Sequence, residues 1–202
     1  MKEDLLNTIE DAVRGIESLK QKETLNFLQT TVNEIVACFK KGGKVLTAGN
    51  GGSLCEAMHL AEELTGFYRD KRPALPAIAI SDPSHLSCVA NDIGFEFVFS
   101  RMIEALGKEN DIFIALTTSG NSQNLIEAAM TAKKKNIKVI GFLGKDGGEL
   151  KHLCDLFWIV KGFSFSDRIQ EAHLTAIHII IQMIEGSLFA PNPAHQVKAD
   201  VK

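Results

Sequence analysis

Residues 45–53 read Val45-Leu46-Thr47-Ala48-Gly49-Asn50-Gly51-Gly52-Ser53, a short apolar run followed at once by a loop of glycine, asparagine and serine. A short apolar run of this kind is typical of a strand that is buried on both faces. Such strands occur in parallel sheets, where a helix follows each strand. The stretch therefore predicts a strand, a loop and a helix of an α/β domain.

Four more apolar runs occupy residues 77–80, 112–116, 139–143 and 156–160, with helical segments between them. Strands that alternate with helices form βαβ units, which make the sheet parallel and place helices on both of its faces. We therefore expect an α/β fold, a three-layer α/β/α sandwich around a five-stranded parallel sheet. In such sheets the ligand lies beyond the carboxyl ends of the strands.

Two amphipathic helices are predicted before the first strand, because apolar residues recur at helical spacing through residues 1–40. Their apolar stripes need partners, so we expect them to serve in oligomerisation. The sheet core spans residues 43–189 and closes with a helix from about Ser166 to Leu188, which Pro191 and Pro193 cannot continue. With 202 residues, the chain 1–202 is predicted to be a single domain.

Composition excludes several classes of protein. The net charge of -3 provides no basic face for nucleic acid. The acidic start is unlike a signal peptide, and the longest apolar pattern, residues 177–184, falls short of the roughly 20 residues that span a bilayer. Four scattered cysteines fit reduced thiols better than a disulfide framework. We expect a cytoplasmic protein without membrane or nucleic-acid partners.

Two loops at strand ends have the composition of phosphate sites. They are residues 49–53 and Thr117-Thr118-Ser119-Gly120-Asn121-Ser122, and each precedes a helix. Glycine lets the backbone approach an anion, hydroxyls donate to its oxygens, and free N–H groups of the helix N-terminus point at it. The same residues also suit an ordinary helix cap. Because neither loop has a dinucleotide or P-loop pattern, we expect a phosphorylated small molecule.

Two predicted helices carry imidazole and carboxylate groups that are candidates for catalysis or metal binding. His59 and Glu63 stand four residues apart, so they share one helix face. His178 interrupts the apolar stretch of the last helix, where the alternative is a core histidine satisfied by the backbone. Spacing places Glu171 nearly in line with His178, and Gln170 somewhat rotated. Such side chains either bind a metal such as zinc or act as acid and base without one.

Six motifs also carry a resemblance to a known family. They are Gly49-Asn50-Gly51-Gly52-Ser53, Ala57-Met58-His59-Leu60-Ala61-Glu62-Glu63-Leu64-Thr65-Gly66, Ala77-Ile78-Ala79-Ile80-Ser81-Asp82, Thr118-Ser119-Gly120-Asn121-Ser122, Gly144-Lys145-Asp146-Gly147-Gly148 and Asp167-Arg168-Ile169-Gln170-Glu171. In order and spacing, over about residues 25–189, they resemble the bacterial phosphoheptose isomerase family of SIS (sugar isomerase) domain proteins. The resemblance implies a flavodoxin-like SIS domain. Thr117 departs from the usual Ser but retains the hydroxyl.

The resemblance implies an aldose–ketose isomerase that converts sedoheptulose 7-phosphate to D-glycero-D-manno-heptose 7-phosphate, the first step of ADP-heptose and lipopolysaccharide core biosynthesis. It implies a homotetramer with sites between subunits and one zinc per subunit. The matched zinc ligands are His59, Glu63, Gln170 and His178, so the resemblance selects Gln170 over Glu171. The matched substrate contacts are Asn50, Gly51, Gly52, Ser53, Asn91, Asp92, Thr117, Thr118, Ser119, Ser122 and Gln170.

Glu63 and His178 are the expected catalytic residues. We expect Glu63 to be the base that moves a carbon proton through an enediol, and His178 to be the acid that serves the oxygens. A carboxylate bound to zinc is a poorer base, so the two roles of Glu63 compete. The alternative function is a non-catalytic SIS protein that binds the replication initiator protein. That relative lacks the acid at the position of Glu63 and has Asn in place of His178.

Overall fold

The computed structural model describes residues 1–189, and the expected helices and strands are present in that range. The last helix spans Ser166–Leu188, as predicted, and Pro191 and Pro193 lie outside the described residues. In chain order the elements are α1 (Lys2–Glu17), η1 (Ser18–Lys20), α2 (Lys22–Lys40), β1 (Val45–Gly49), α3 (Gly52–Thr65), β2 (Ala77–Ala79), α4 (Pro83–Asp92), η2 (Phe95–Phe97), α5 (Val98–Leu106), β3 (Ile112–Thr117), α6 (Gln123–Lys134), β4 (Lys138–Gly144), η3 (Leu150–His152), β5 (Leu156–Val160) and α7 (Ser166–Leu188).

The five strands form one parallel sheet in the order β2-β1-β3-β4-β5, which confirms the predicted sheet. Every residue of β1 and of β3 is buried, as expected for strands covered on both faces. The strand that follows β1 in the chain lies on one side of it, at the β2 edge, whereas the strands that follow β3 lie on the other side, toward β5. The strand order therefore reverses between β1 and β3. Gly49 pairs with Leu116 in the register, and the loops after β1 and β3 therefore leave the sheet side by side.

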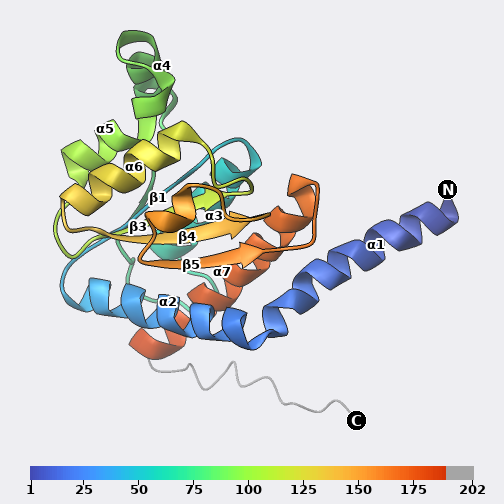
Figure 1. Ribbon diagram of the computed structural model, residues 1–202. Coiled ribbons are helices and arrows are strands. Elements are labelled where there is room, and N and C mark those ends of the chain that lie inside the picture. The colour runs from blue at the N-terminus through green and yellow to red at the C-terminus, as the bar shows by residue number, and fades with distance from the viewer. Residues whose placement is uncertain (190–202) are drawn as a thin grey trace.

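Helices cover both faces of the sheet, which confirms the three-layer sandwich (Figure 1). On one face α2, α3 and α7 pack a core that contains Phe27, Leu60 and Ile177. On the other face α5 and α6 pack a second core that contains Phe99 and Leu125. Among the helices of residues 1–189, none combines the length and apolarity needed to cross a bilayer.

Helix α1 extends away from the sheet, as Figure 1 shows. Its last turns cross the start of α7 at Gly15, where a Cβ would lie 3.4 Å from the carbonyl oxygen of Arg168. The predicted apolar stripe is present but stays exposed in the single chain, with Leu5, Ile9 and Val13 each half exposed or more. The stripe is therefore an apolar face without a partner inside the described chain.

Candidate active site

The first candidate loop makes the turn from β1 into α3. Gly51, the N-cap of α3, has φ 55° and ψ −122°, a conformation that favours glycine. A Cβ on Gly52 would lie 2.6 Å from the amide of Gln170, so a glycine there lets that α7 side chain approach the loop. No described side chain caps α3, and the N–H groups of Ser53 and Leu54 donate to the carbonyl oxygens of Asn50 and Gly51 at 3.1 and 3.0 Å.

The second candidate loop makes the turn from β3 into α6. Thr117 is buried, and its hydroxyl oxygen accepts the N–H of Gly120 at 3.2 Å. The hydroxyls of Thr118 and Ser166 lie 3.0 Å apart and connect the loop to the start of α7. Ser122 is the N-cap of α6 without a side-chain capping bond. Thr117 therefore shapes the loop, whereas the Ser122 hydroxyl does not cap α6.

Two asparagines join these loops. The Asn50 amide donates to Asn124 Oδ1 at 2.9 Å, and the Asn124 amide donates to Asn50 Oδ1 at 2.9 Å. Within the second loop, Ser119 Oγ accepts the N–H of Asn121 at 3.2 Å. Asn124 is buried and was missed by the sequence reasoning. The signal for it was a polar residue on the apolar face of the helix that follows the loop.

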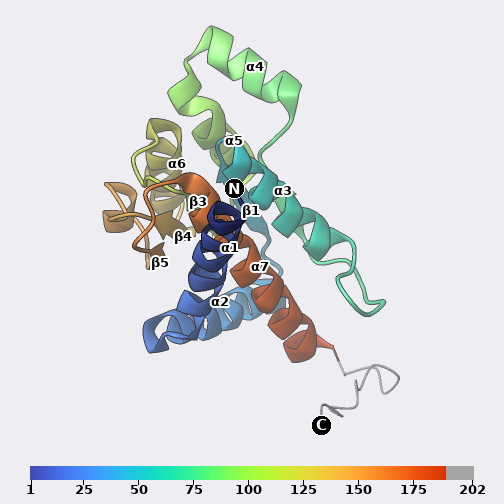
Figure 2. The same cartoon turned by 90° about the vertical axis from the view of Figure 1, so that its right-hand side faces the viewer.

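Helix α3 runs beside α7 in the same direction (Figure 2). His59 and Glu63 of α3 meet His178 of α7 there. His59 Nε2 lies 2.9 Å from His178 Nε2 and 3.6 Å from Glu63 Oε1. Glu62 Oε1 lies 3.2 Å from the other ring nitrogen of His59, Nδ1. The helical spacing of His59 and Glu63 predicted their shared face correctly, and the packing of the two helices adds His178.

His178 is not a core histidine, which was the alternative interpretation of the sequence. His173 is the buried one: its Nε2 lies 3.1 Å from the carbonyl oxygen of Leu143, and burial lowers its pKa to about 4. His178 is partly exposed and lies against the stacked ring of Tyr68 at 5.6 Å between centroids. Burial, then the neighbouring charge of His59, lowers the pKa of His178 from its ordinary value.

Gln170 and Glu171 lie apart from this cluster. Gln170 Nε2 is 3.5 Å from the hydroxyl oxygen of Ser53, so it faces the first loop. Glu171, which spacing favoured, forms two bonds of 2.7 and 2.5 Å with Arg168. Eight residues of helix separate Gln170 from His178, about 12 Å along the axis. One chain therefore does not gather all four matched zinc ligands at one point, and their joint role stays a prediction.

Asn91 and Asp92 are the last two residues of α4 and are exposed. The Asn91 amide donates to Asp92 Oδ1 at 2.7 Å, and the Cys88 thiol lies 3.5 Å from Asp92 Oδ2. Within residues 1–189 no hydrogen bond joins the two residues to either loop. Their assignment as substrate contacts stays a prediction.

The donor set of the cluster fits zinc. His59, Glu63 and His178 offer two imidazole nitrogens and a carboxylate oxygen, which are ligands that zinc binds in proteins. Glu62 occupies the place of the outer carboxylate that commonly fixes a metal-bound histidine through its second nitrogen. Ligand atoms of His59, Glu62 and Glu63 all lie within 4.8 Å of one another.

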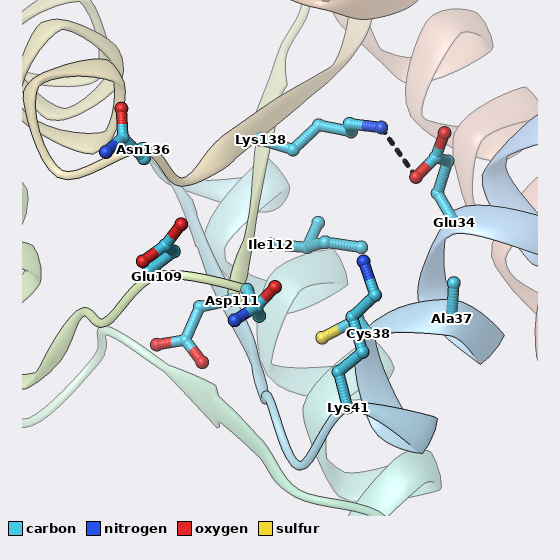
Figure 3. A pocket seen from close by; sticks show the side chains of 10 residues that line it. Glu34, Ala37, Cys38, Lys41, Glu109, Asp111, Ile112, Asn136 and Lys138 are labelled. Atoms are coloured by element: carbon cyan, nitrogen blue, oxygen red, sulfur yellow. Dashed lines mark ion pairs between the residues drawn. The ribbon is translucent and has the colours of Figure 1, made fainter.

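A hollow of about 170 Å³ lies at the amino ends of the strands, at the end of the sheet opposite the two loops (Figure 3). It is lined by charges of both signs, and the ion pair of Lys138 with Glu34, 2.6 Å between Nζ and Oε2, spans part of it. Asp111 in its wall is already paired with Lys44. The hollow lies at the amino ends of β3 and β4, away from both loops, and we do not assign the active site to it.

Comparisons with known proteins identify the family of the chain. The SIS domain family model matches residues 9–144. The chain is 53% identical to a phosphoheptose isomerase of Glaesserella parasuis over 167 residues, 83% of this chain and 87% of that one. It is 50% identical to one of Pectobacterium atrosepticum over 190 residues, 93% and 98% of the two chains. The solved phosphoheptose isomerase of Neisseria gonorrhoeae has a TM-score of 0.85 at 32% identity, covering 92% and 98%.

Glu56 is a buried acid next to the site. It lies on α3 one turn after Ser53 and is 5% exposed, and neither carboxylate oxygen has a hydrogen-bond partner among the described residues. Burial raises its pKa from 4.5 to about 8, and the nearby Ser53 hydroxyl, outside hydrogen-bond geometry, offsets only part of the shift. The folded protein therefore keeps Glu56 largely neutral at pH 7.

We expect Glu56 to make folding less favourable as pH rises. Between pH 4.5 and 8 the unfolded chain loses the Glu56 proton while the folded chain keeps it. The free energy of unfolding therefore falls by up to about 1.4 kcal/mol per pH unit in this window. Urea unfolding of Glu56→Gln at pH 5 and pH 8 should show a flatter pH dependence, and the exposed control Glu104→Gln should match the wild type. An equal slope in all three would contradict the assignment.

Proposed function

We propose that this chain, which belongs to the SIS domain family and to its phosphoheptose isomerases, interconverts sedoheptulose 7-phosphate and D-glycero-D-manno-heptose 7-phosphate. The observation that carries the proposal is the cluster of His59, Glu63 and His178 beside two phosphate-type loops. Moving a carbonyl from C2 to C1 requires a base, an acid and a substrate that is kept in place. The reaction supplies a heptose precursor for lipopolysaccharide.

The loops at the strand reversal are the proposed phosphate and sugar site. The N-termini of α3 and α6 both point to the edge where β1 and β3 end. The positive dipole ends of these helices and the hydroxyls of Ser53 and Ser122 suit phosphate oxygens. Gln170 lies beside Ser53 and is placed to contact the substrate. A role for Gln170 in binding metal would require a copy from another subunit.

We propose that Glu63 and His178 carry out the proton transfers. The Glu63 carboxylate removes a proton from C1 of the ketose, and the electron pair left behind forms the C1–C2 double bond of an enediol. His178 gives a proton to O2 as the carbonyl becomes a hydroxyl. Glu63 then returns the carbon proton to C2, and His178 takes the proton of O1 as the new carbonyl forms. Each transfer contributes about 10²- to 10⁴-fold in rate.

We propose one zinc per subunit, bound by His59, Glu63 and His178. When bound, zinc polarises the oxygens of the substrate. Glu62 orients His59 by accepting the proton of its Nδ1. Glu63 and His178 transfer protons only through atoms that are not bound to the metal at that moment, so zinc binding and proton transfer belong to different stages of turnover.

The non-catalytic alternative, a protein that binds the replication initiator, is not favoured. The relatives described above are phosphoheptose isomerases over most of their length. The chain also keeps both Glu63 and His178, and the structure brings their helices together. A protein that only binds the initiator would not need this arrangement of acid and base.

We further propose a cytoplasmic homotetramer. The exposed apolar face of α1, formed by Leu5, Leu6, Ile9, Val13 and Ile16, supports association, because large apolar patches on a surface mark protein contacts. The four cysteines are all free, which supports a reducing compartment. Closed symmetric assemblies are the common outcome when identical faces pair.

Turnover tests the function directly. Purified protein incubated with sedoheptulose 7-phosphate, with and without zinc, should form the aldose, followed by NMR. Glu63→Gln and His178→Asn should each lower kcat by about 10²-fold or more, since each removes a proton-transfer group. Glu104→Gln, an exposed acid on α5, should keep wild-type turnover. A folded wild-type protein without turnover under any metal condition would reject the enzyme.

Zinc binding can be measured without turnover. Metal analysis and isothermal titration should find one zinc per wild-type subunit. His59→Gln should remove most of the bound metal, and Glu62→Gln should weaken binding about 10- to 100-fold, because it removes the carboxylate that fixes His59. Unchanged zinc affinity in both variants would place the metal elsewhere.

The α1 face can be tested by charge. The double variant Leu5→Glu and Ile9→Glu should dissociate into smaller species in size-exclusion chromatography with light scattering, because the charges oppose burial of the stripe. Glu10→Gln, on the same helix, serves as the control. A wild-type protein that is monomeric at micromolar concentration would overturn the assembly.

A further inference from the structure

Arg72 caps the helix that carries the proposed base. Its side chain, in the connection between α3 and β2, is 2% exposed, and Nε lies 2.6 Å from Glu185 Oε1. The guanidinium also donates to the carbonyl oxygens of Glu63 at 2.7 Å, Leu64 at 2.9 Å and Gly66 at 3.1 Å. Carbonyls in the last turn of a helix lack partners within the helix, and a cation there is favoured by the helix dipole.

Glu185 connects the same cation to the proposed acid. It lies near the end of α7, and its carboxylate accepts the N–H of Tyr68 at 3.1 Å and that of Arg69 at 3.4 Å. The Tyr68 ring stacks on His178 with an interplanar angle of 21°. The guanidinium carbon of Arg69 lies 5.3 Å from the centroid of the Tyr68 ring. One carboxylate thus holds the backbone of the residue that packs on His178.

We propose that Arg72 and Glu185 are positioning residues of the active site, whose buried pair fixes the end of α3 next to Glu63 and the Tyr68 ring next to His178. Base and acid then keep one relative geometry. The assignment of base and acid rests on the proposed function, but the placement of Tyr68 does not. A displacement of about 1 Å in a catalytic group can lower a rate by about 10²-fold.

The chemistry of the pair suits positioning more than stability. A buried ion pair recovers little net stability, because removing two charges from water offsets most of their attraction. The planar guanidinium bonds one carboxylate and several carbonyls in fixed directions, which a lysine ammonium cannot reproduce. The pair of Arg101 with Glu104 on α5 offers a contrast, because both of its side chains are about half exposed.

Tyr68 gives the test a single probe, because it is the one tyrosine of the sequence. Protein grown with ¹³C-tyrosine shows one set of ring signals, shifted by the stacked His178 ring. In Arg72→Lys and in Glu185→Gln these signals should move toward those of free tyrosine. With sedoheptulose 7-phosphate, kcat should fall about 10- to 100-fold while KM changes less than about threefold, since phosphate binding is untouched.

Arg101→Lys is the matched control and should leave both the ring signals and kcat at wild-type values. If Arg72→Lys does not fold, Glu185→Gln, which keeps the shape of the side chain, carries the same test. An unmoved Tyr68 signal or an unchanged kcat in a folded variant overturns the proposal. Moved signals in a protein whose wild type has no turnover would uphold the placement of Tyr68 and reject the proposed function.

Discussion

Helices α3 and α7 run side by side in the same direction, and contacts at both ends maintain this pairing. At the amino ends, Gly52 leaves room for the Gln170 amide. At the carboxyl end of α3, the buried pair of Arg72 with Glu185 connects the two helices. The imidazoles of His59 and His178 meet between these contacts. The site therefore depends on the relative placement of two helices more than on any single loop.

The sheet sets the other half of the site. Because β1 and β3 are neighbours and the chain leaves them toward opposite edges, two helix N-termini approach one point at the strand ends. The reciprocal amide bonds of Asn50 and Asn124 hold the loops at that point. In the proposed site, helix dipoles and hydroxyls would bind the phosphate of the substrate, although the net charge of the protein is -3.

Several polar groups are buried at a cost in stability. Glu56 lacks a hydrogen-bond partner among the described residues, and His173 has an unpaired Nδ1 there. A core built of apolar residues at those positions would avoid the desolvation of both groups. Glu56 lies on the helix of the proposed base and His173 on that of the proposed acid. Buried polar groups near a site commonly accompany function, and these two lie on the paired helices themselves.

By itself the sequence determined the strands, the helices, the loops and the shared face of His59 and Glu63, because each of these depends on residues close together in the chain. Only the tertiary structure decided that His178 contacts His59, 119 residues away, and that the Glu171 carboxylate pairs with Arg168 instead of facing the site. Asn124, Tyr68, Arg72 and Glu185 were missed for the same reason. Their partners lie on other elements, and packing between elements leaves no periodic signal in a single sequence.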